Sequence, residues 1–245
     1  MIEIIPAIDL IDGKCVRLAQ GDFSRATVYS DDPVETAKQF ESTGVRRLHI
    51  VDLDGAKNGR VTNLSVLERI ARTTGLVVDF GGGIKTDEDI AAVFNAGAAI
   101  TNIGSTAVKD PDRFSVWLGE YGNEKILLGA DVRNETVAIN GWQTPTDLDL
   151  IPFLTLWSVR GLRQAFVTDI ACDGMSSGPS VELYEKIREN LPDLDLIASG
   201  GVASEDDIWA LEKAGCKGVI IGRAIYEGKI DLTRLGRRRD RERAC

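Results

Sequence analysis

Two observations predict that this chain of 245 residues folds as an α/β protein, a (β/α)8 TIM barrel built from two repeated half-barrels. The first is that short apolar strand patterns alternate with amphipathic helix patterns from end to end, which is typical of a parallel sheet covered by helices. The second is an internal repeat. The stretch 80–105, FGGGIKTDEDIAAVFNAGAAITNIGS, recurs at 198–223 as ASGGVASEDDIWALEKAGCKGVIIGR, with nine of 26 positions identical. A repeat at half the chain length indicates two joined half-barrels.

The strand and helix patterns follow one another in regular order. The predicted strands are Ile4–Leu10, Leu48–Leu53, Leu76–Phe80, Ala99–Ile103, Ile126–Val132, Ala165–Ile170, Leu194–Ala198 and Gly218–Ile221. Helix starts between them carry capping residues or a proline in the first turn, as at Pro33. In the two repeat copies, Thr86 with Asp89 and Ser204 with Asp207 predict capping boxes.

The remaining segments are predicted to be loops, with one exception and a distinct tail. The alternating residues Thr136–Ile139 suggest a small extra hairpin, which presents Gly141 and Trp142 away from the core. We expect one domain over residues 1–230. The arginine-rich residues 231–245 are expected to be a last helix or a frayed, solvated end without an assigned function.

Composition excludes several classes of partner. A net charge of -9 argues against nucleic acid, whose binding needs a surplus of Lys and Arg. No apolar run is long enough to cross a bilayer, and the N-terminus shows no signal-peptide pattern. The four cysteines have no paired spacing, and with one histidine no metal cluster is recognisable. We therefore expect a cytoplasmic protein with reduced thiols and no bound metal, and we expect a monomer.

Each copy of the repeat contains a Gly-Gly loop and an Ile-Gly loop. Glycine has no Cβ, so backbone N–H groups can approach an anion such as phosphate closely. A single loop of this kind is more often only a tight turn. Two copies, each with both loops, favour two phosphate sites related by the repeat, and therefore a ligand that has a phosphate at each end.

Four predicted strands have an aspartate at or near their carboxyl ends, where barrel enzymes carry their chemistry. The repeat offset pairs Asp9 with Asp131 and Asp52 with Asp169 as facing carboxylates. One ionised and one protonated carboxyl group suit proton transfer. A strand-end aspartate also commonly caps a loop or forms an ion pair with a nearby basic side chain. For Asp9 and Asp131 together, however, we favour a catalytic role.

Four other residues are candidates for substrate binding. His49 lies inside the second strand, where a buried structural histidine is commoner than a substrate contact. Trp142 would cover an apolar patch or stack on a flat ring. Arg17, in the loop after the first strand, and Lys85, just past the triple glycine, would hold phosphate charge or remain solvated.

Several separate segments, in matching order and spacing, closely resemble the ProFAR isomerases of histidine biosynthesis. They include IPAIDLIDGKCVRLAQGD at 5–22, LHIVDLDGAK at 48–57, TDIACDGM at 168–175 and IGRAIYEGK at 221–229, and the resemblance covers nearly the whole chain up to Lys229. It implies a two-half barrel that catalyses an Amadori rearrangement of an aminoaldose to an aminoketose. The implied substrate is a small molecule with two phosphates, and no metal or organic cofactor is implied.

The resemblance also implies roles for individual residues. Asp9 would be the general base that removes the C2′ proton, and the general acid would be Asp131 or Asp169, with the repeat symmetry favouring Asp131. Trp142 would stack on the substrate as its loop closes. The implied phosphate-binding residues are Gly82, Gly83, Gly104 and Ser105 at one end, and Gly200, Gly201, Gly222 and Arg223 at the other.

Two positions depart from the family pattern, and three alternatives remain open. The loop Ala171–Gly174 has Cys172 where the family commonly has arginine, and Lys85 replaces a frequent arginine. The first change would weaken loop closure. The alternatives are a bifunctional isomerase that also acts on phosphoribosyl anthranilate, the sister imidazole glycerol phosphate synthase cyclase with its glutaminase partner, and a non-catalytic phosphate-binding barrel.

Overall fold

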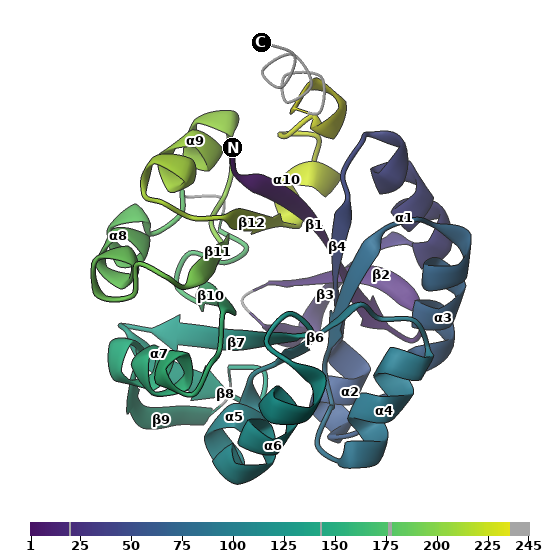
Figure 1. The fold of residues 1–245 in the computed structure, drawn as a ribbon. Coiled ribbons are helices and arrows are strands. Elements are labelled where there is room, and N and C mark those ends of the chain that lie inside the picture. The colour runs from purple at the N-terminus through teal and green to yellow at the C-terminus, as the bar shows by residue number, and fades with distance from the viewer. Residues whose placement is uncertain (20, 143, 176–177, 236–245) are drawn as a thin grey trace.

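The computed structural model describes residues 1–19, 21–142, 144–175 and 178–235, and a closed barrel of parallel strands lies at its centre (Figure 1). The barrel strands, in order around the ring, are β1 (Glu3–Ile11), β4 (Arg47–Asp52), β5 (Val77–Gly81), β6 (Ile100–Ile103), β7 (Ile126–Arg133), β10 (Gln164–Asp169), β11 (Asp195–Ser199) and β12 (Gly218–Ile221). β12 pairs with β1 and closes the ring. Each predicted strand is present with its ends shifted by at most one residue, so the predicted fold class is confirmed.

The two half-barrels have matching strand registers. In the first half Asp9 on β1 lies opposite Val51 on β4, and in the second half Asp131 on β7 lies opposite Thr168 on β10. Asp9 and Asp131 therefore occupy equivalent positions, as the repeat predicted.

Each half also has an antiparallel hairpin after its first strand. β2 (Lys14–Ala19) and β3 (Asp22–Ser30) extend β1, and β8 (Thr136–Ile139) and β9 (Thr144–Asp149) extend β7. The hairpin predicted at Thr136–Ile139 is confirmed. The first hairpin corrects our prediction of a loop after the first strand.

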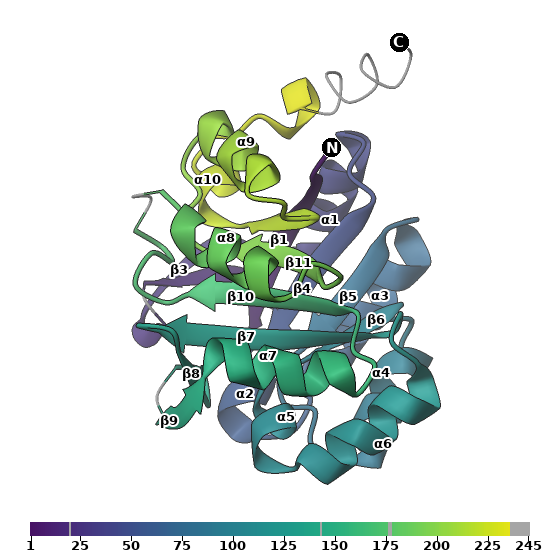
Figure 2. The same cartoon turned by 60° about the vertical axis from the view of Figure 1, so that its left-hand side comes forward.

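Helices surround the barrel and cover the outer faces of its strands (Figures 1 and 2). They are α1 (Pro33–Ser42), α2 (Leu53–Asn58), α3 (Leu64–Thr73), α4 (Asp87–Asn95), α5 (Ser105–Lys109), α6 (Pro111–Tyr121), α7 (Leu150–Val159), α8 (Val181–Asn190), α9 (Glu205–Lys213) and α10 (Arg223–Tyr226). The capping boxes predicted from Thr86 and Ser204 are present at α4 and α9. The short helix α2 replaces part of a predicted polar loop, because Asp52 caps its first turn at the Gly55 N–H.

Apolar side chains form two cores. The larger core lies between the barrel and the helices, and a smaller one inside the barrel contains Ile5, Ala7, Leu127, Ile197 and Ile220. Leu232 and Leu235, at the start of the predicted tail, are buried in the larger core, whereas the arginine run after residue 235 lies outside the described residues. None of the helices in the described part of the chain has the length and apolar content that a bilayer crossing requires.

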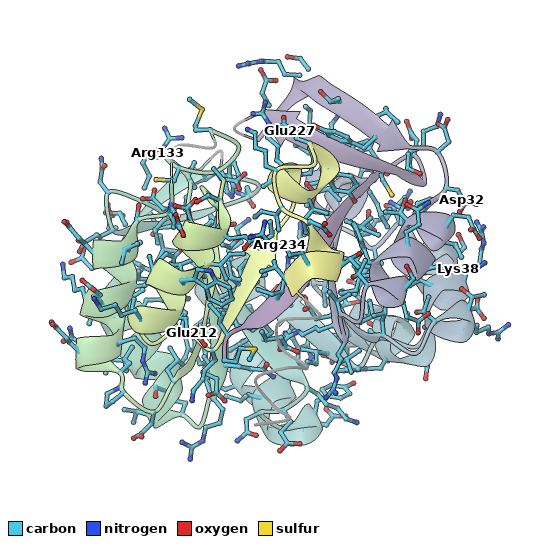
Figure 3. All side chains as sticks on the ribbon, turned by 90° about the horizontal axis from the view of Figure 1, so that it is seen from above. Asp32, Lys38, Arg133, Glu212, Glu227 and Arg234 are labelled. Atoms are coloured by element: carbon cyan, nitrogen blue, oxygen red, sulfur yellow. The ribbon has the colours of Figure 1, made fainter. Side chains whose placement is uncertain are left out.

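The carboxyl ends of the parallel strands and both hairpins lie at one end of the barrel (Figure 2). In Figure 3, Arg133 at the end of β7 and Glu227 after α10 lie towards the end that carries the β2–β3 hairpin, and Glu212 at the end of α9 lies towards the other end. The loops that follow the barrel strands therefore meet at one face, where active sites occur in this architecture.

Candidate active site

A cavity of about 530 Å³ lies at the carboxyl ends of the barrel strands. The predicted site residues that line it are Asp9, Arg17, His49, Gly82, Gly83, Lys85, Gly104, Ser105, Asp131, Trp142, Gly200, Gly201, Gly222 and Arg223. Asp169 is not part of this lining, and neither is Asp52, its predicted facing partner. The structure thus brings together residues that are far apart in the sequence.

The glycine loops of the two repeat copies lie across the cavity from each other. One pair of loops follows β5 and β6, and the other follows β11 and β12, which are diametrically opposite in the ring. The first-turn N–H groups of α5 and α10 have no acceptor within their own helices. This arrangement fits a ligand with an anionic group at each end.

Glycine is required at two of these loop positions for a steric reason. Gly83 and Gly201 have φ of +83° and +82°, a region that side chains disfavour. A Cβ on Gly83 would lie 2.6 Å from the backbone carbon of Arg60, and a Cβ on Gly201 would lie 2.4 Å from the Gly178 carbonyl oxygen. The loop backbone is therefore closely packed on the side where a Cβ would lie, and both glycines line the cavity.

We expect Gly201→Ala to be more destabilising than Gly228→Ala, which is a matched control. Gly228 also has a positive φ, +68°, but a Cβ there meets no atom within 4 Å. The control should lose about 1–2 kcal/mol of unfolding free energy, because only backbone strain is added. Gly201→Ala should lose more and should also raise the KM for a phosphorylated substrate. Denaturant unfolding and steady-state kinetics measure both effects, and equal stability losses would contradict the steric argument.

Asp9 and Asp131 face the cavity from strands on opposite sides of the ring, β1 and β7. Burial raises the pKa of Asp9 above its usual value, the Arg17 guanidinium works against this shift, and the Asp173 charge adds to it. Burial also raises the pKa of Asp131 to about 6, against hydrogen bonds from Thr168 and Trp142. The direction from Asp9 on β1 to Asp131 on β7 therefore runs across the direction from the loops after β5 and β6 to those after β11 and β12.

Arg17 is held in the cavity wall by ionic contacts. It lies in β2 rather than in the predicted loop, and its Nη1 donates to Asp9 Oδ2 at 2.9 Å. Its Nη2 is 3.9 Å from Asp173 Oδ1. A Cβ on Gly222 would lie 2.4 Å from the guanidinium carbon, so the glycine gives Arg17 its space. Arg17 therefore connects a catalytic candidate to one glycine loop.

Trp142, in the turn between β8 and β9, lines the cavity and contacts the turn between β2 and β3. Its indole donates a hydrogen bond to Asp131, and its ring lies so close to Gly21 that a Cβ there would be 2.6 Å away. Trp142 has φ of +71°, which is unusual for a bulky residue and is typical of functional loops. Lys85 is exposed at the rim beside Gly59.

Asp52 and Asp169 organise loops behind the site instead of facing the cavity. Asp52 is fully buried and accepts hydrogen bonds from the backbone N–H groups of Gly55, Thr62 and Asn63. Asp169 accepts from the Ala171 N–H at 2.9 Å and from the Ser180 hydroxyl. The expected facing pair of Asp52 and Asp169 is therefore not formed across the cavity.

Asp173 is a cavity residue that the sequence reasoning missed. It lines the cavity in the loop after β10, next to Arg17. The Asp-Gly pair in ACDGMSSG marks this position, but the strand-end pattern predicts Asp169 instead. Cys172, the departure from the family loop, contacts the Ser180 hydroxyl oxygen at 3.2 Å and so lies within the loop.

Asp79 on β5 was also missed, and it holds His49. The His49 Nδ1 is 2.5 Å from Asp79 Oδ1, and Arg47 Nε donates to Asp79 Oδ2 at 2.9 Å. Burial alone would raise the pKa of Asp79, but the charges and hydrogen bonds of His49 and Arg47 outweigh it and lower that pKa to about 2. His49 is thus both a buried, hydrogen-bonded histidine and a residue of the cavity wall.

The fold and the cavity define a two-half (β/α)8 barrel with opposed carboxyl groups between two pairs of glycine loops. Among the described residues, no group of three or more His, Cys, Asp and Glu is placed to hold a metal ion. The profile of a family described as "Histidine biosynthesis protein" matches residues 3–231, and the chain belongs to this family.

Three relatives show how similar the chain is to proteins of this family. It is 56% identical over 235 residues to a protein of Bacteroides thetaiotaomicron, with 96% of this chain and 98% of the relative covered. It is 54% identical to a protein of Phocaeicola vulgatus (97% and 99% covered) and 48% identical to one of Flavobacterium johnsoniae (96% and 98% covered). All three are named 1-(5-phosphoribosyl)-5-((5-phosphoribosylamino)methylideneamino)imidazole-4-carboxamide isomerase, or ProFAR isomerase, which confirms the resemblance found in the sequence.

Proposed function

We propose that the chain is a ProFAR isomerase that carries out the Amadori rearrangement of histidine biosynthesis. The observation that carries this conclusion is one cavity in which two opposed carboxyl groups, Asp9 and Asp131, lie between two opposed pairs of glycine loops. A substrate with a phosphate at each end would span the loops and place its central sugar between the carboxyl groups. The name shared by the relatives supports the same activity.

The rearrangement needs one acid and one base on the same sugar. In our proposal Asp131 protonates the ribose ring oxygen, the C1′–O bond breaks, and the nitrogen lone pair forms a C1′=N iminium. Asp9 then removes the C2′ proton, and the C–H electrons form the C1′=C2′ bond of an enolamine while nitrogen regains its lone pair. Proton transfer from the C2′ hydroxyl to C1′ completes the aminoketose. C1′ is reduced as C2′ is oxidised, so atoms and electrons balance within the substrate.

The pKa shifts support this division of roles. Asp131, with its pKa raised to about 6, can hold a proton for the ring oxygen. Asp9 has a raised pKa that makes its carboxylate a stronger base, while its ion pair with Arg17 favours the ionised form. We propose that Trp142 covers the sugar and excludes water from the enolamine, and that Lys85 and Arg223 add charge at the two phosphates.

A direct assay tests the proposed function and its alternatives together. We expect the purified protein to convert ProFAR to its phosphoribulosyl isomer. Phosphoribosyl anthranilate, assayed in parallel, would reveal the bifunctional alternative, and cyclisation of the isomerised product with ammonia would reveal the cyclase. Binding of ProFAR without turnover would instead show a non-catalytic barrel and would overturn the proposal.

The cellular and quaternary expectations belong to the same proposal. We propose a monomer in the cytoplasm, and the free thiols of Cys15, Cys172 and Cys216 support a reducing compartment. Light scattering after size-exclusion chromatography measures the oligomeric state, and a stable dimer at working concentrations would contradict the proposed monomer.

A further inference from the structure

A polar network fills one side of the barrel interior. Asp79 is fully buried and accepts from Arg47 Nε and from Asn102 Nδ2 at 3.0 Å, and its Oδ1 is in contact with His49 Nδ1. Arg47 and His49 are 7% and 4% exposed. The network runs from the interior to the cavity, where His49 and Asn102 form part of the wall. Arg47 and Asp79 do not line the cavity themselves.

The second half-barrel shows that the fold does not need this network. His49 lies opposite Asp79 in the first half, and Phe166 lies opposite Ile197 at the same register in the second half. Arg47 corresponds in the same way to Gln164, which is opposite Asp195 as Arg47 is opposite Val77. The same backbone positions are therefore filled mainly by apolar side chains in the other half of the molecule.

Buried ion pairs of this kind contribute little to stability. Removing two charges from water costs several kcal/mol, and an apolar replacement of similar volume is often neutral or stabilising. In addition, Arg47 Nη2 is buried and has no hydrogen-bond partner among the described residues, which is unfavourable by about 1–3 kcal/mol. Stability therefore does not explain the network, whose repeat counterpart is largely apolar, and this indicates a role at the cavity.

The network fixes which nitrogen of His49 carries a proton. An ionised carboxylate only accepts hydrogen bonds, so His49 Nδ1 must donate to Asp79. A neutral ring with the proton on Nδ1 leaves an acceptor lone pair on Nε2. The edge contact with Phe166, at 5.1 Å between ring centroids, restricts the ring from the opposite strand.

We propose that Asp79 and Arg47 are positioning residues that hold His49 in its Nδ1–H form, so that Nε2 accepts a hydrogen bond from a sugar hydroxyl at the centre of the substrate. The identity of that hydroxyl group rests on the proposed function. The hydrogen bond between Asp79 and the His49 ring does not rest on the proposed function, because both groups belong to the protein. His49 lies on β4, between β1, which carries Asp9, and β5, which precedes the loop of Gly82, so it faces the middle of the proposed ligand.

Nuclear magnetic resonance gives a direct test, because the chain has one histidine and therefore one pair of ring nitrogen signals. In protein labelled with ¹⁵N-histidine, at mildly alkaline pH, we expect a protonated Nδ1 and an unprotonated Nε2. The variant Arg47→Gln/Asp79→Ile copies the residues of the second half-barrel and leaves no unpaired buried charge. We expect it to fold and to lose the Nδ1–H signature. Arg47→Gln/Asp79→Leu, which likewise removes the acceptor of Nδ1–H and leaves no unpaired buried charge, is the second variant if the first double variant does not fold.

Kinetics then test whether the network acts through His49. We expect Arg47→Gln/Asp79→Ile and His49→Asn each to lower kcat/KM for ProFAR by about 10- to 100-fold, by analogy with the loss of residues that orient metal-binding histidines. Combining them should cause no further loss, since both remove the same Nε2 contact. Multiplying losses, or an unchanged tautomer in the variants, would overturn the proposal. A wild-type protein that folds but does not turn over ProFAR would refute the proposed function and the contact with the sugar hydroxyl. The tautomer measurement would still decide whether Asp79 fixes the proton on His49 Nδ1.

Discussion

Replacing Asp9 with asparagine is expected to lower kcat for ProFAR by about 10²- to 10⁴-fold, with substrate binding retained. The amide has nearly the same shape as the carboxyl group but cannot take the C2′ proton. The glycine loops, which we propose bind the two phosphates, lie on other strands and are unchanged by the substitution. The loss should therefore appear in kcat, as expected when an interaction of the transition state is removed.

A nearby surface aspartate provides the matched control for this variant. Asp12 lies just beyond the end of β1, is exposed and does not line the cavity, and its φ of +49° suits asparagine. Asp12→Asn should keep wild-type turnover. Equilibrium binding of substrate to Asp9→Asn separates a chemical defect from lost affinity, and a kcat within a few-fold of wild type would remove Asp9 from the base role.

The barrel could be predicted from sequence because its strands are largely apolar and because several helices begin with capping residues, as α4 and α9 do. The first hairpin was missed because β3 is largely exposed and carries no simple alternation. A turn signal was nevertheless present: Asp12 and Gly13 both have positive φ and form a two-residue connection between β1 and β2, which is what an Asp-Gly pair favours. Strand prediction from burial pattern is weakest where a hairpin stands away from the core.

The site residues could be predicted where the internal repeat or a glycine loop identified them. They could not be predicted where the sequence does not show whether a side chain points into the cavity or towards its own loop. Asp9 and Asp131 share one register, so the repeat identified both. Asp169 also ends a strand, but its carboxylate accepts bonds from its own loop, and Asp173, four residues later, faces the cavity instead. Asp79 lies within a strand, and its partners Arg47 and His49 come from a neighbouring strand that only folding brings close.

The acid role of Asp131 predicts a specific pH dependence. Its pKa is raised to about 6 by burial, so the carboxyl group is protonated below that value and loses its proton as the pH rises through it. If the protonated form is the acid, kcat/KM of the wild type should fall as the pH rises through about 6. Asp131→Asn should lower activity by about 10²- to 10⁴-fold and should no longer show this decline.

Two further variants distinguish Asp131 from the other aspartates of the second half-barrel. Asp169→Asn should keep the decline and mainly raise KM, because it loosens the loop after β10 through the contacts with Ala171 and Ser180. Asp173→Asn should also keep the decline, but it releases Arg17 on one side and should weaken substrate binding. Titration of the essential acid causes the decline in kcat/KM as the pH rises. If the decline instead disappears in Asp173→Asn and persists in Asp131→Asn, Asp173 is the acid and Asp131 only orients Trp142.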